Sequence, residues 1–419
     1  MRLNTQPNMS EIARTAGLAE QNIQQFISDS PWSGYELINK LQKDIGAHPH
    51  YQKESVLLVD ESADEKAGEA SAGAARQYNG RLGKVDLSQV GVFLSLTKQG
   101  YHTWVDGELY WPEHWFEADY APQRQKVGLP ADRSFQTKLE LALRLVKRAQ
   151  HNGLPFVALD CDSLYGRKGW LRDEFDRLGL EYYADTPENT QLYLSPPLLR
   201  PKLDQNEQPT SQWEIVGQVY PVKTLKDEPD THWHKLTLRP NERGMLLADF
   251  ARRRVWTVRE DNSLRPEWLL IRQSASQTTY SFSNAAQDSP LELMAHRKSQ
   301  RYFIERSNQE AKSDFGWDEF QALKYRAWQH QLALTIMASW FITETRLEWQ
   351  QKFAPEPDLL QYYEIEILPN LSVANVRTLL RATLPLPQLS PLQAAQLVVK
   401  HLDNRIRSRK SRLLKARSP

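Results

Sequence analysis

The chain has 419 residues, of which 25% are charged and 40% hydrophobic, a composition typical of a globular protein of roughly two to three domains. Its formal net charge of +1 excludes a uniformly basic nucleic-acid-binding protein but not local basic clusters. The single cysteine, Cys161, excludes an intramolecular disulfide framework, and with no apolar run of about 18 residues and no signal peptide we expect a cytoplasmic protein without membrane segments.

The N-terminal residues 9–29 have a helical pattern that is interrupted once. Their apolar residues recur at helical spacing, and Gly17 separates two short helical segments. This arrangement is typical of a helix-turn-helix, which would make residues 1–50 a helical DNA-binding region. An ordinary helical hairpin gives the same short pattern, so both interpretations stay open.

Residues 51–187 alternate between strands and helices. Strands are predicted at Val56–Asp60 and Val90–Thr97, followed by a hairpin at Tyr101–Trp111 that turns at Asp106-Gly107. An amphipathic helix is predicted from about 135 to 151, then a buried strand at 155–162, a helix at 167–180 and an extended segment at 181–186. This order predicts an α/β fold in which helices cover a mixed sheet.

The rest of the chain divides by pattern into three parts. Residues 188–290 contain short alternating runs broken by Pro, Gly, Asn and Asp, which predict a β-rich segment. Helical periodicity returns over 291–350, and residues 351–419 are predicted to be helical pieces that end in a basic tail. Such a tail is either solvated or a contact to nucleic-acid phosphates.

Acidic residues stand at the ends of two predicted buried strands. Asp60 ends the first, and Asp160 and Asp162 end the strand at 155–162. Because a buried charge is costly unless it is paired or bound to metal, these acids are either loop caps or ligands at the sheet edge. A third acid, Glu305, lies on a predicted helix and shares one face with Arg301 and Lys312. Alone, that stripe is typical of a solvated, salt-bridged helix.

The three acids together favour a metal site. Three carboxylates that converge without a cation would repel one another. Two divalent ions that prefer oxygen ligands, Mg²⁺ or Mn²⁺, would satisfy all of them. Such a pair of ions activates a water or a 3′-hydroxyl and stabilises the leaving oxygen. The combination predicts phosphoryl transfer by two metal ions.

Three blocks of sequence resemble the DDE transposases of bacterial insertion sequences. They are Leu57–Leu96, which contains "GAARQYNG"; Ala158–Gly166, "ALDCDSLYG"; and Arg301–Phe341, which opens with "RYFIERSNQEAK". The resemblance spans about residues 20–345. It implies a ribonuclease H-like catalytic core in two parts, 51–187 and 291–350, interrupted by a β-rich insertion at 188–290.

The resemblance also implies roles for individual residues. Asp60, Asp162 and Glu305 match the catalytic, metal-binding acids of the family, and Arg301 and Lys312 match the basic residues of its Arg-Glu-Lys signature. The tyrosine that often stands three residues before the arginine is replaced by Lys298. The second acid is doubled, and Asp162, in the Asp-x-x-Tyr-Gly context, matches better than Asp160.

Further basic and aromatic residues are candidates for DNA contacts. The phosphate-binding candidates are Arg76, Lys84, Arg252, Arg253 and Arg254, and the base-stacking candidates are Trp256 and Trp268. The structural alternatives are a solvated turn for the three consecutive arginines and core packing for the tryptophans. No Gly-Lys-Ser/Thr phosphate loop occurs, so no nucleotide cofactor is expected.

These features predict a Mg²⁺-dependent DNA transposase. It would bind the terminal inverted repeats of its element on double-stranded DNA as a homodimer, cut each end, and join the freed 3′-hydroxyl to target DNA. Two alternatives stay open: an inactive or domesticated DNA-binding protein of the same fold, and a metal-dependent nuclease that acts on another nucleic acid such as RNA. The expected location is the cytoplasm, at the nucleoid when DNA is bound.

Overall fold

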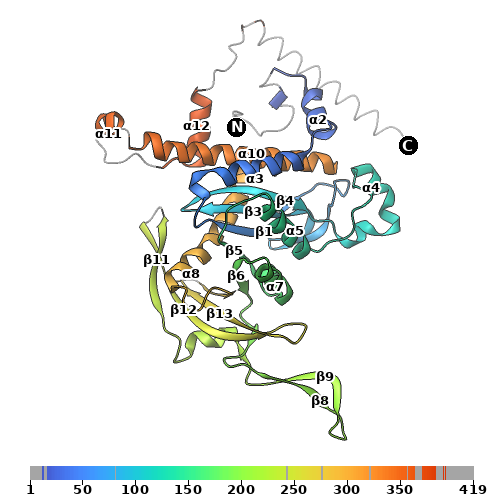
Figure 1. The fold of residues 1–419 in the computed structure, drawn as a ribbon. Coiled ribbons are helices and arrows are strands. Elements are labelled where there is room, and N and C mark those ends of the chain that lie inside the picture. Colours follow the sequence, from blue (N-terminus) through green and yellow to red (C-terminus); the bar gives the residue numbers. More distant parts are fainter. Residues whose placement is uncertain are drawn as a thin grey trace.

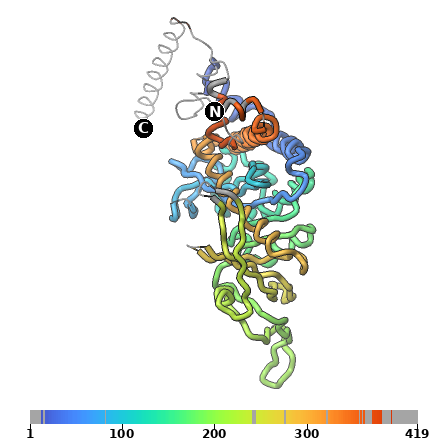
Figure 2. The backbone as a smooth tube through the Cα atoms, turned by 90° about the vertical axis from the view of Figure 1, so that its left-hand side faces the viewer, coloured from blue at the N-terminus to red at the C-terminus, as the bar shows by residue number. Residues whose placement is uncertain are grey.

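The computed structural model describes residues 12–13, 17–80, 82–241, 244–274, 277–319, 322–355, 357–363, 370–383, 390 and 392. Within these residues the molecule is elongated, with a central sheet, long helices packed at one end and a β-hairpin arm at the other (Figure 1 and Figure 2). The predicted basic tail and most of the first N-terminal helix lie outside the described residues.

Helices and strands follow one another along the chain largely in the predicted order. The strands are β1 (Val56–Glu65), β2 (Ala75–Asn79), β3 (Lys84–Lys98), β4 (Tyr101–Leu109), β5 (Ala158–Cys161), β6 (Glu181–Thr186), β7 (Gln191–Leu192), β8 (Leu198–Leu203), β9 (Pro209–Val216), β10 (Tyr220–Pro221), β11 (His234–Asn241), β12 (Gly244–Val258), β13 (Leu264–Gln273) and β14 (Thr278–Ser283). The helices are α2 (Glu20–Ser28), α3 (Gly34–Ala47), α4 (Ala121–Val127), α5 (Lys138–His151), α6 (Ser163–Gly166), α7 (Gly169–Arg177), α8 (Leu291–Lys298), α9 (Tyr302–Ser313), α10 (Tyr325–Glu348), α11 (Pro357–Tyr363) and α12 (Val373–Thr383).

Ten of the described strands form one mixed sheet. Its order is β11-β12-β13-β14-β6-β5-β1-β3-β2, with β4 also paired to β3. The strands β1, β5 and β6 are parallel neighbours, whereas β14 joins β6 in the antiparallel direction. Strands β11–β14 of the predicted β-rich segment therefore extend the same sheet. The predicted fold class, an α/β fold of the ribonuclease H-like kind with a mixed sheet flanked by helices, is confirmed.

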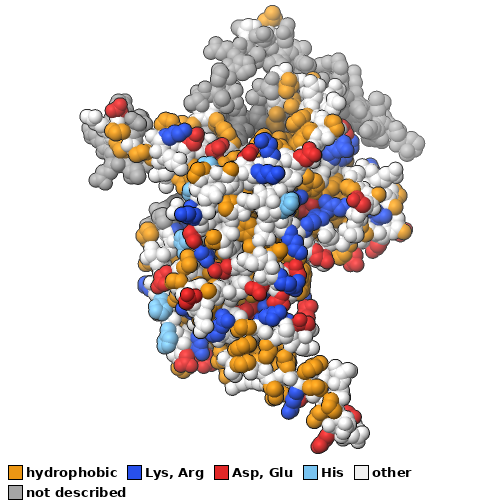
Figure 3. Space-filling model, in the orientation of Figure 1, with side chains coloured by type: hydrophobic (Ala, Val, Ile, Leu, Met, Phe, Trp, Pro, Cys, Tyr) orange, Lys and Arg blue, Asp and Glu red, His pale blue; other side chains and the backbone are white. Residues whose placement is uncertain are grey.

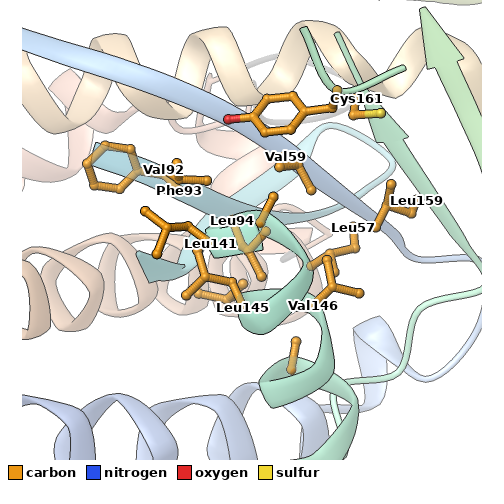
Figure 4. Packing of buried hydrophobic residues seen from close by; sticks show 14 of the residues in the cluster. Leu57, Val59, Val92, Phe93, Leu94, Leu141, Leu145, Val146, Leu159 and Cys161 are labelled. Carbon is orange, nitrogen blue, oxygen red and sulfur yellow. The ribbon is translucent and has the colours of Figure 1, made fainter. Parts of the chain in front are cut away.

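The two faces of β1 pack against different helices. Leu57 and Val59 belong to the large apolar core that includes Leu141 and Leu145 of α5 (Figure 4). Helix α5 begins at Thr137 in a capping box, whose Glu140 side chain accepts from the Thr137 backbone N–H. The alternate residues Val56 and Leu58 belong to a second core, which includes Met294 of α8 and Ile304 of α9. Because side chains alternate along a strand, Asp60 lies on the face covered by α8 and α9.

The first predicted strand is longer than its apolar pattern. We expected it to end at Asp60, but β1 continues to Glu65 because its antiparallel pairing with β3 persists over all ten residues. The parallel pairing with β5, in contrast, stops at Val59. Asp60 therefore lies inside β1 but directly beyond the end of its parallel contact. After Asp60 the strand is only partly buried and carries acidic residues, so its apolar pattern does not predict that it continues.

The predicted hairpin at Tyr101–Trp111 is wrong, because these residues form the continuous strand β4 up to Leu109. Asp106 is fully buried, and Arg148 and Gln42 bind its carboxylate. Gly107 does not form a turn. It leaves room for the ring of Phe93, which would lie 2.8 Å from a Cβ at this position. A buried Asp-Gly pair held by a distant arginine cannot be distinguished from a turn by local sequence.

Strands β8 and β9 form a separate two-stranded hairpin that projects from the sheet (Figure 1 and Figure 3). Its apolar residues Trp213 and Ile215 remain 51% and 39% exposed. Elsewhere on the face shown in Figure 3, Lys and Arg are mixed with Asp and Glu, as the small net charge suggests. None of the helices in the described ranges is both long enough and apolar enough to cross a membrane.

Candidate active site

Three aspartates follow the same row of residues across three parallel strands. Val59 of β1 pairs with Cys161 of β5, and Cys161 pairs with Ala184 of β6. Asp60, Asp162 and Asp185 each come one residue after this row, at the carboxyl edge of the parallel part of the sheet. This edge is where α/β sheets commonly bind ligands. The topology thus brings together two of the predicted acids and one that the sequence analysis did not select.

Asp60 and Asp162 are close enough to influence each other's charge. Burial raises the pKa of Asp60 to about 8; Arg301 opposes this rise, and the charge of Asp162 adds to it. Burial also raises the pKa of Asp162, and the nearby Glu61 carboxylate contributes. The Oδ1 atom of Asp162 accepts hydrogen bonds from the backbone N–H groups of Leu164 and Tyr165, at 2.9 and 3.4 Å. These bonds hold Asp162 at the start of α6.

The adjacent Asp160 has a different environment. Its side chain is fully buried, and Lys298 Nζ lies 2.9 Å from Oδ1. Lys298 also lies 3.0 Å from Asp185, so one ammonium group bridges two strands. Lys298 therefore neutralises Asp160. This geometry supports the choice of Asp162 over Asp160 as a ligand.

Arg301 connects the acids on the sheet with the acid on α9. Its Nη2 lies 3.9 Å from Asp60 Oδ2, and its Nε lies 3.7 Å from Asp185 Oδ2. Its Nη1 donates to Glu305 Oε1 at 2.8 Å, one helical turn away. The acids raise the pKa of Arg301 above its usual range despite its burial, so the guanidinium stays charged.

Glu305 does not converge with the two aspartates in this arrangement. Its side chain is 58% exposed, in the ion pair with Arg301. Among the described residues, no group of three Asp, Glu, His or Cys side chains is positioned to hold a metal ion. Glu310, the other acid of α9, is no replacement, because its carboxylate binds His102 at 3.0 Å and Arg306 at 3.2 Å.

The residues present fit a divalent cation in part. Asp60 and Asp162 repel each other, and a cation between them would remove that repulsion. Carboxylate oxygens are also the ligands that Mg²⁺ and Mn²⁺ prefer. To complete the three-acid set, Glu305 would have to exchange Arg301 for the cation.

A cavity of about 570 Å³ opens beside these residues. It is lined by Asp162, Ser163, Asp185, Thr186, Glu188, Arg239, Leu246, Arg272, Gln277, Thr278, Thr279, Tyr280, Lys298, Ser299, Arg301, Tyr302 and Glu305. The lining includes acids from β6 and α9 and arginines from β11 and β13. The cavity therefore offers sites for cations and for anions close together.

Of the seven predicted phosphate-binding residues, Arg301 lines this cavity and the other six do not. Lys312 donates to the backbone carbonyl of Ala63 at 2.6 Å, which ties α9 to β1. Arg76 is exposed on β2 and lines a second cavity with His114 and Tyr120. Lys84 is exposed on β3 and pairs with Asp86 at 2.8 Å. Their contact with DNA stays a prediction.

The three consecutive arginines lie inside β12, so the solvated-turn alternative is wrong. The guanidinium groups of Arg252 and Arg254 lie over the ring of Trp268, at 4.5 and 5.3 Å from its centroid. Arg253 donates to the Thr231 hydroxyl at 3.2 Å, on the opposite face. The indole N–H of Trp268 donates to the Ala286 carbonyl, and the ring packs against the second core.

Trp256 is half-buried on β12, where its backbone N–H and carbonyl both bond to Tyr193. Neither Trp256 nor Trp268 lines the cavity beside the acids. Base stacking by these two residues stays a prediction.

Sequence reasoning missed Asp185, Arg239 and Arg272. Asp185 had a usable signal, since "EYYADT" has the same pattern of a buried run that ends in an acid as the other two strands. Arg239 and Arg272 had none, because each is one arginine among many in a β-rich segment. Only the pairing of β11–β14 onto β6 places them beside the acids.

Comparison with known proteins identifies the family of the chain. Residues 2–245, more than half of the chain, match the family described as DDE superfamily endonuclease. This range contains Asp60 and Asp162 and ends before α9. A protein of Microchaete diplosiphon described as a probable transposase for insertion sequence element IS701 is 24% identical over 324 residues, which cover 76% of this chain and 73% of the relative. The resemblance inferred from the three sequence blocks is confirmed, and the chain belongs to the DDE superfamily endonuclease family.

Proposed function

We propose that this protein is a DNA transposase that cuts the ends of an insertion sequence and joins them to target DNA. The observation that carries the proposal is the row formed by Asp60 and Asp162 at the edge of the parallel strands, with Arg301 beside them. The family match and the transposase relative from Microchaete diplosiphon support the same reaction. Double-stranded DNA is the substrate, and a homodimer would hold the two ends of the element.

In this proposal Asp60, Asp162 and Glu305 hold two divalent ions, Mg²⁺ or Mn²⁺. The ions would supply Lewis acidity and lower the pKa of the attacking water or 3′-hydroxyl. Asp162 is oriented by the N-terminus of α6, and Asp60 is held by the rigid pairing of β1 with β3. Arg301 donates to Glu305 in this structure, and in the proposed reaction it would turn to a phosphate oxygen as Glu305 moved toward the ions. Lys312 anchors the helix that carries both residues.

The test is strand cleavage of a duplex that carries the ends of the element, with Mg²⁺ or Mn²⁺. We expect Asp60→Asn and Asp162→Asn each to reduce cleavage by at least about 100-fold, because each removes a ligand charge, while DNA binding is kept. Asp44→Asn is the matched control, since Asp44 is an exposed aspartate of α3 that pairs with Lys40.

Three results would overturn the proposal. Cleavage that survives both substitutions would exclude the acid pair as the catalytic site. Binding of duplex DNA without cleavage by the unsubstituted chain, with either ion, would indicate a DNA-binding protein without this activity. Faster cleavage of RNA than of duplex DNA would indicate a nuclease of another kind.

A further inference from the structure

Two arginines of the β-rich segment face the cavity that contains the candidate catalytic acids. Arg239 lies on β11 and Arg272 on β13, and both line the cavity together with Asp162 and Arg301. Arg272 shares its side of β13 with Leu270, which belongs to the core under α8 and α9. The two arginines therefore lie on the same face of the sheet as Asp60, although about 180 residues or more separate Asp60 from either arginine in the sequence.

A local irregularity of β11 directs Arg239 into the cavity. The pairing of β11 with β12 shifts register between Thr237 and Arg239, and the residue between them, Leu238, is buried. Such a bulge changes the direction in which the next side chain points, and bulges are frequent beside active sites. The guanidinium of Arg239 lies over the ring of Tyr302 at 3.9 Å, so its position is supported by α9.

In the part of the chain that the structure describes, neither arginine is paired directly with an acid, although the charge of Asp185 lies close enough to Arg272 to raise its pKa. The Nε atoms of Arg239 and Arg272 are both buried without a hydrogen-bond partner. Within the described ranges, neither side chain forms an ion pair or a side-chain hydrogen bond, unlike the bridged Lys298. Burial lowers the pKa of Arg272, and the nearby charge of Arg239 lowers it further. Two unpaired cations held together at one wall of a cavity are costly unless an anion binds between them.

We propose that Arg239 and Arg272 form a phosphate-binding site for the DNA strand that enters the cavity, gripping a backbone phosphate next to the one that is cut. This inference rests on the proposed function. Guanidinium groups bind phosphate oxygens with two parallel hydrogen bonds, and an anion that reached the two buried Nε atoms would satisfy them. A strand held at this wall would place its next phosphate toward Asp162 and Arg301. The β-rich segment thereby contributes directly to the site instead of only enlarging the sheet.

The first experiment measures duplex DNA binding against salt concentration, without divalent ions so that cleavage does not interfere. Log K falls as log salt rises, and each lost phosphate contact makes this slope shallower by about 0.9. We expect Arg239→Gln and Arg272→Gln each to make the slope shallower by about that amount. The lysine variants R239K and R272K should keep most of the slope of the unsubstituted chain. Arg200→Gln is the matched control, since Arg200 is an exposed arginine of β8 paired with Glu214. An unchanged slope in both glutamine variants would overturn the proposal.

The second experiment separates a DNA phosphate from a free anion and does not depend on the proposed function. Thermal unfolding of the full chain is followed with increasing inorganic phosphate. We expect phosphate to raise the melting temperature of the unsubstituted chain but not that of R239Q/R272Q, because a ligand stabilises only the state that binds it. Stabilisation by phosphate with an unchanged DNA slope would overturn the assignment to DNA and identify a free anion as the ligand. If the unsubstituted chain binds no DNA, the proposed function fails, whereas the phosphate result still decides whether the anion site exists.

Discussion

Lys298 Nζ lies 2.9 Å from the carboxylate of Asp160, and both side chains are buried. This ion pair separates the two aspartates of the Asp-Cys-Asp sequence into one that is neutralised inside the sheet and one that reaches the cavity. The pair also gives Lys298 a role in the fold, since its ammonium group is placed between Asp160 and Asp185. Lys298 is the ion-pair partner of Asp160, whereas Asp162 accepts hydrogen bonds from the backbone of α6.

We predict that Asp160→Asn destabilises the protein by about 3–5 kcal/mol, because it leaves Lys298 buried with only part of its compensation. Unfolding in urea at pH 7 measures this change. The double variant Asp160→Asn/Lys298→Met should recover much of the loss, since it removes both charges at similar volume. Asp162→Asn should change the unfolding free energy much less than Asp160→Asn. The opposite ranking would mean that Asp160, not Asp162, faces the metal.

We predict that Mg²⁺ or Mn²⁺ raises the melting temperature of the unsubstituted chain, because a cation relieves the repulsion between Asp60 and Asp162. Asp60→Asn and Asp162→Asn should abolish this increase. Without divalent ions, both variants should be as stable as the unsubstituted chain or slightly more stable. Thermal scans with and without each ion provide the measurement. An equal metal-induced increase in the Asp60→Asn variant would place the metal site elsewhere.

The two acids of α9 should respond differently to substitution. Glu305→Gln should change the unfolding free energy by less than about 1 kcal/mol, because the ion pair with Arg301 is exposed, but it should abolish cleavage. Glu310→Gln should destabilise the protein by about 1–3 kcal/mol, because it weakens a largely buried contact to His102, and it should leave substantial cleavage. Urea unfolding and the cleavage assay measure the two effects. A loss of cleavage only in Glu310→Gln would exclude Glu305 as the third acid.

The buried Glu267 should make stability depend on pH in the acid range. Arg172 Nε lies 2.8 Å from its Oε1, Arg259 Nη1 lies 3.0 Å from its Oε2, and Tyr182 donates at 2.6 Å. Although burial alone would raise the pKa of Glu267, the two arginines lower it from 4.5 to about 2. The stabilisation, about 3 kcal/mol, is complete above pH 4.5 and is lost as the pH falls toward 2.

Glu267→Gln tests this dependence. At pH 7 the variant should be less stable by about 3–5 kcal/mol, because two arginines lose their common partner. The difference from the unsubstituted chain should shrink as the pH falls from 4.5 to 2, when measured by urea unfolding at each pH. Glu260→Gln, at an exposed position shortly after β12, is the control and should show no such trend. A difference that does not vary with pH would mean that the carboxylate charge does not stabilise the fold.

Much of the fold was predictable because it depends on local patterns. The helical spacing before His151 predicted α5, and the apolar runs predicted the buried parts of β1, β3 and β5. The exceptions are positions where a distant residue compensates a locally unfavourable one. Asp106 lies in a strand because Arg148 and Gln42 bind it, and Asp60 lies within β1 because β3 continues to pair beyond the apolar run.

The amino-acid sequence by itself determined the α/β class, the family, and the assignment of Asp60 and Asp162 as candidate ligands, because these follow from short blocks whose spacing is visible along the chain. The tertiary structure alone decided which acids and bases share the cavity. Asp185 joins the row because β6 is parallel to β5, and Lys298 claims Asp160 because α8 crosses that face. Arg239 and Arg272 reach the acids because β11–β14 extend the same sheet. Contacts of this kind depend on strand order and register, which arise from pairing between distant segments.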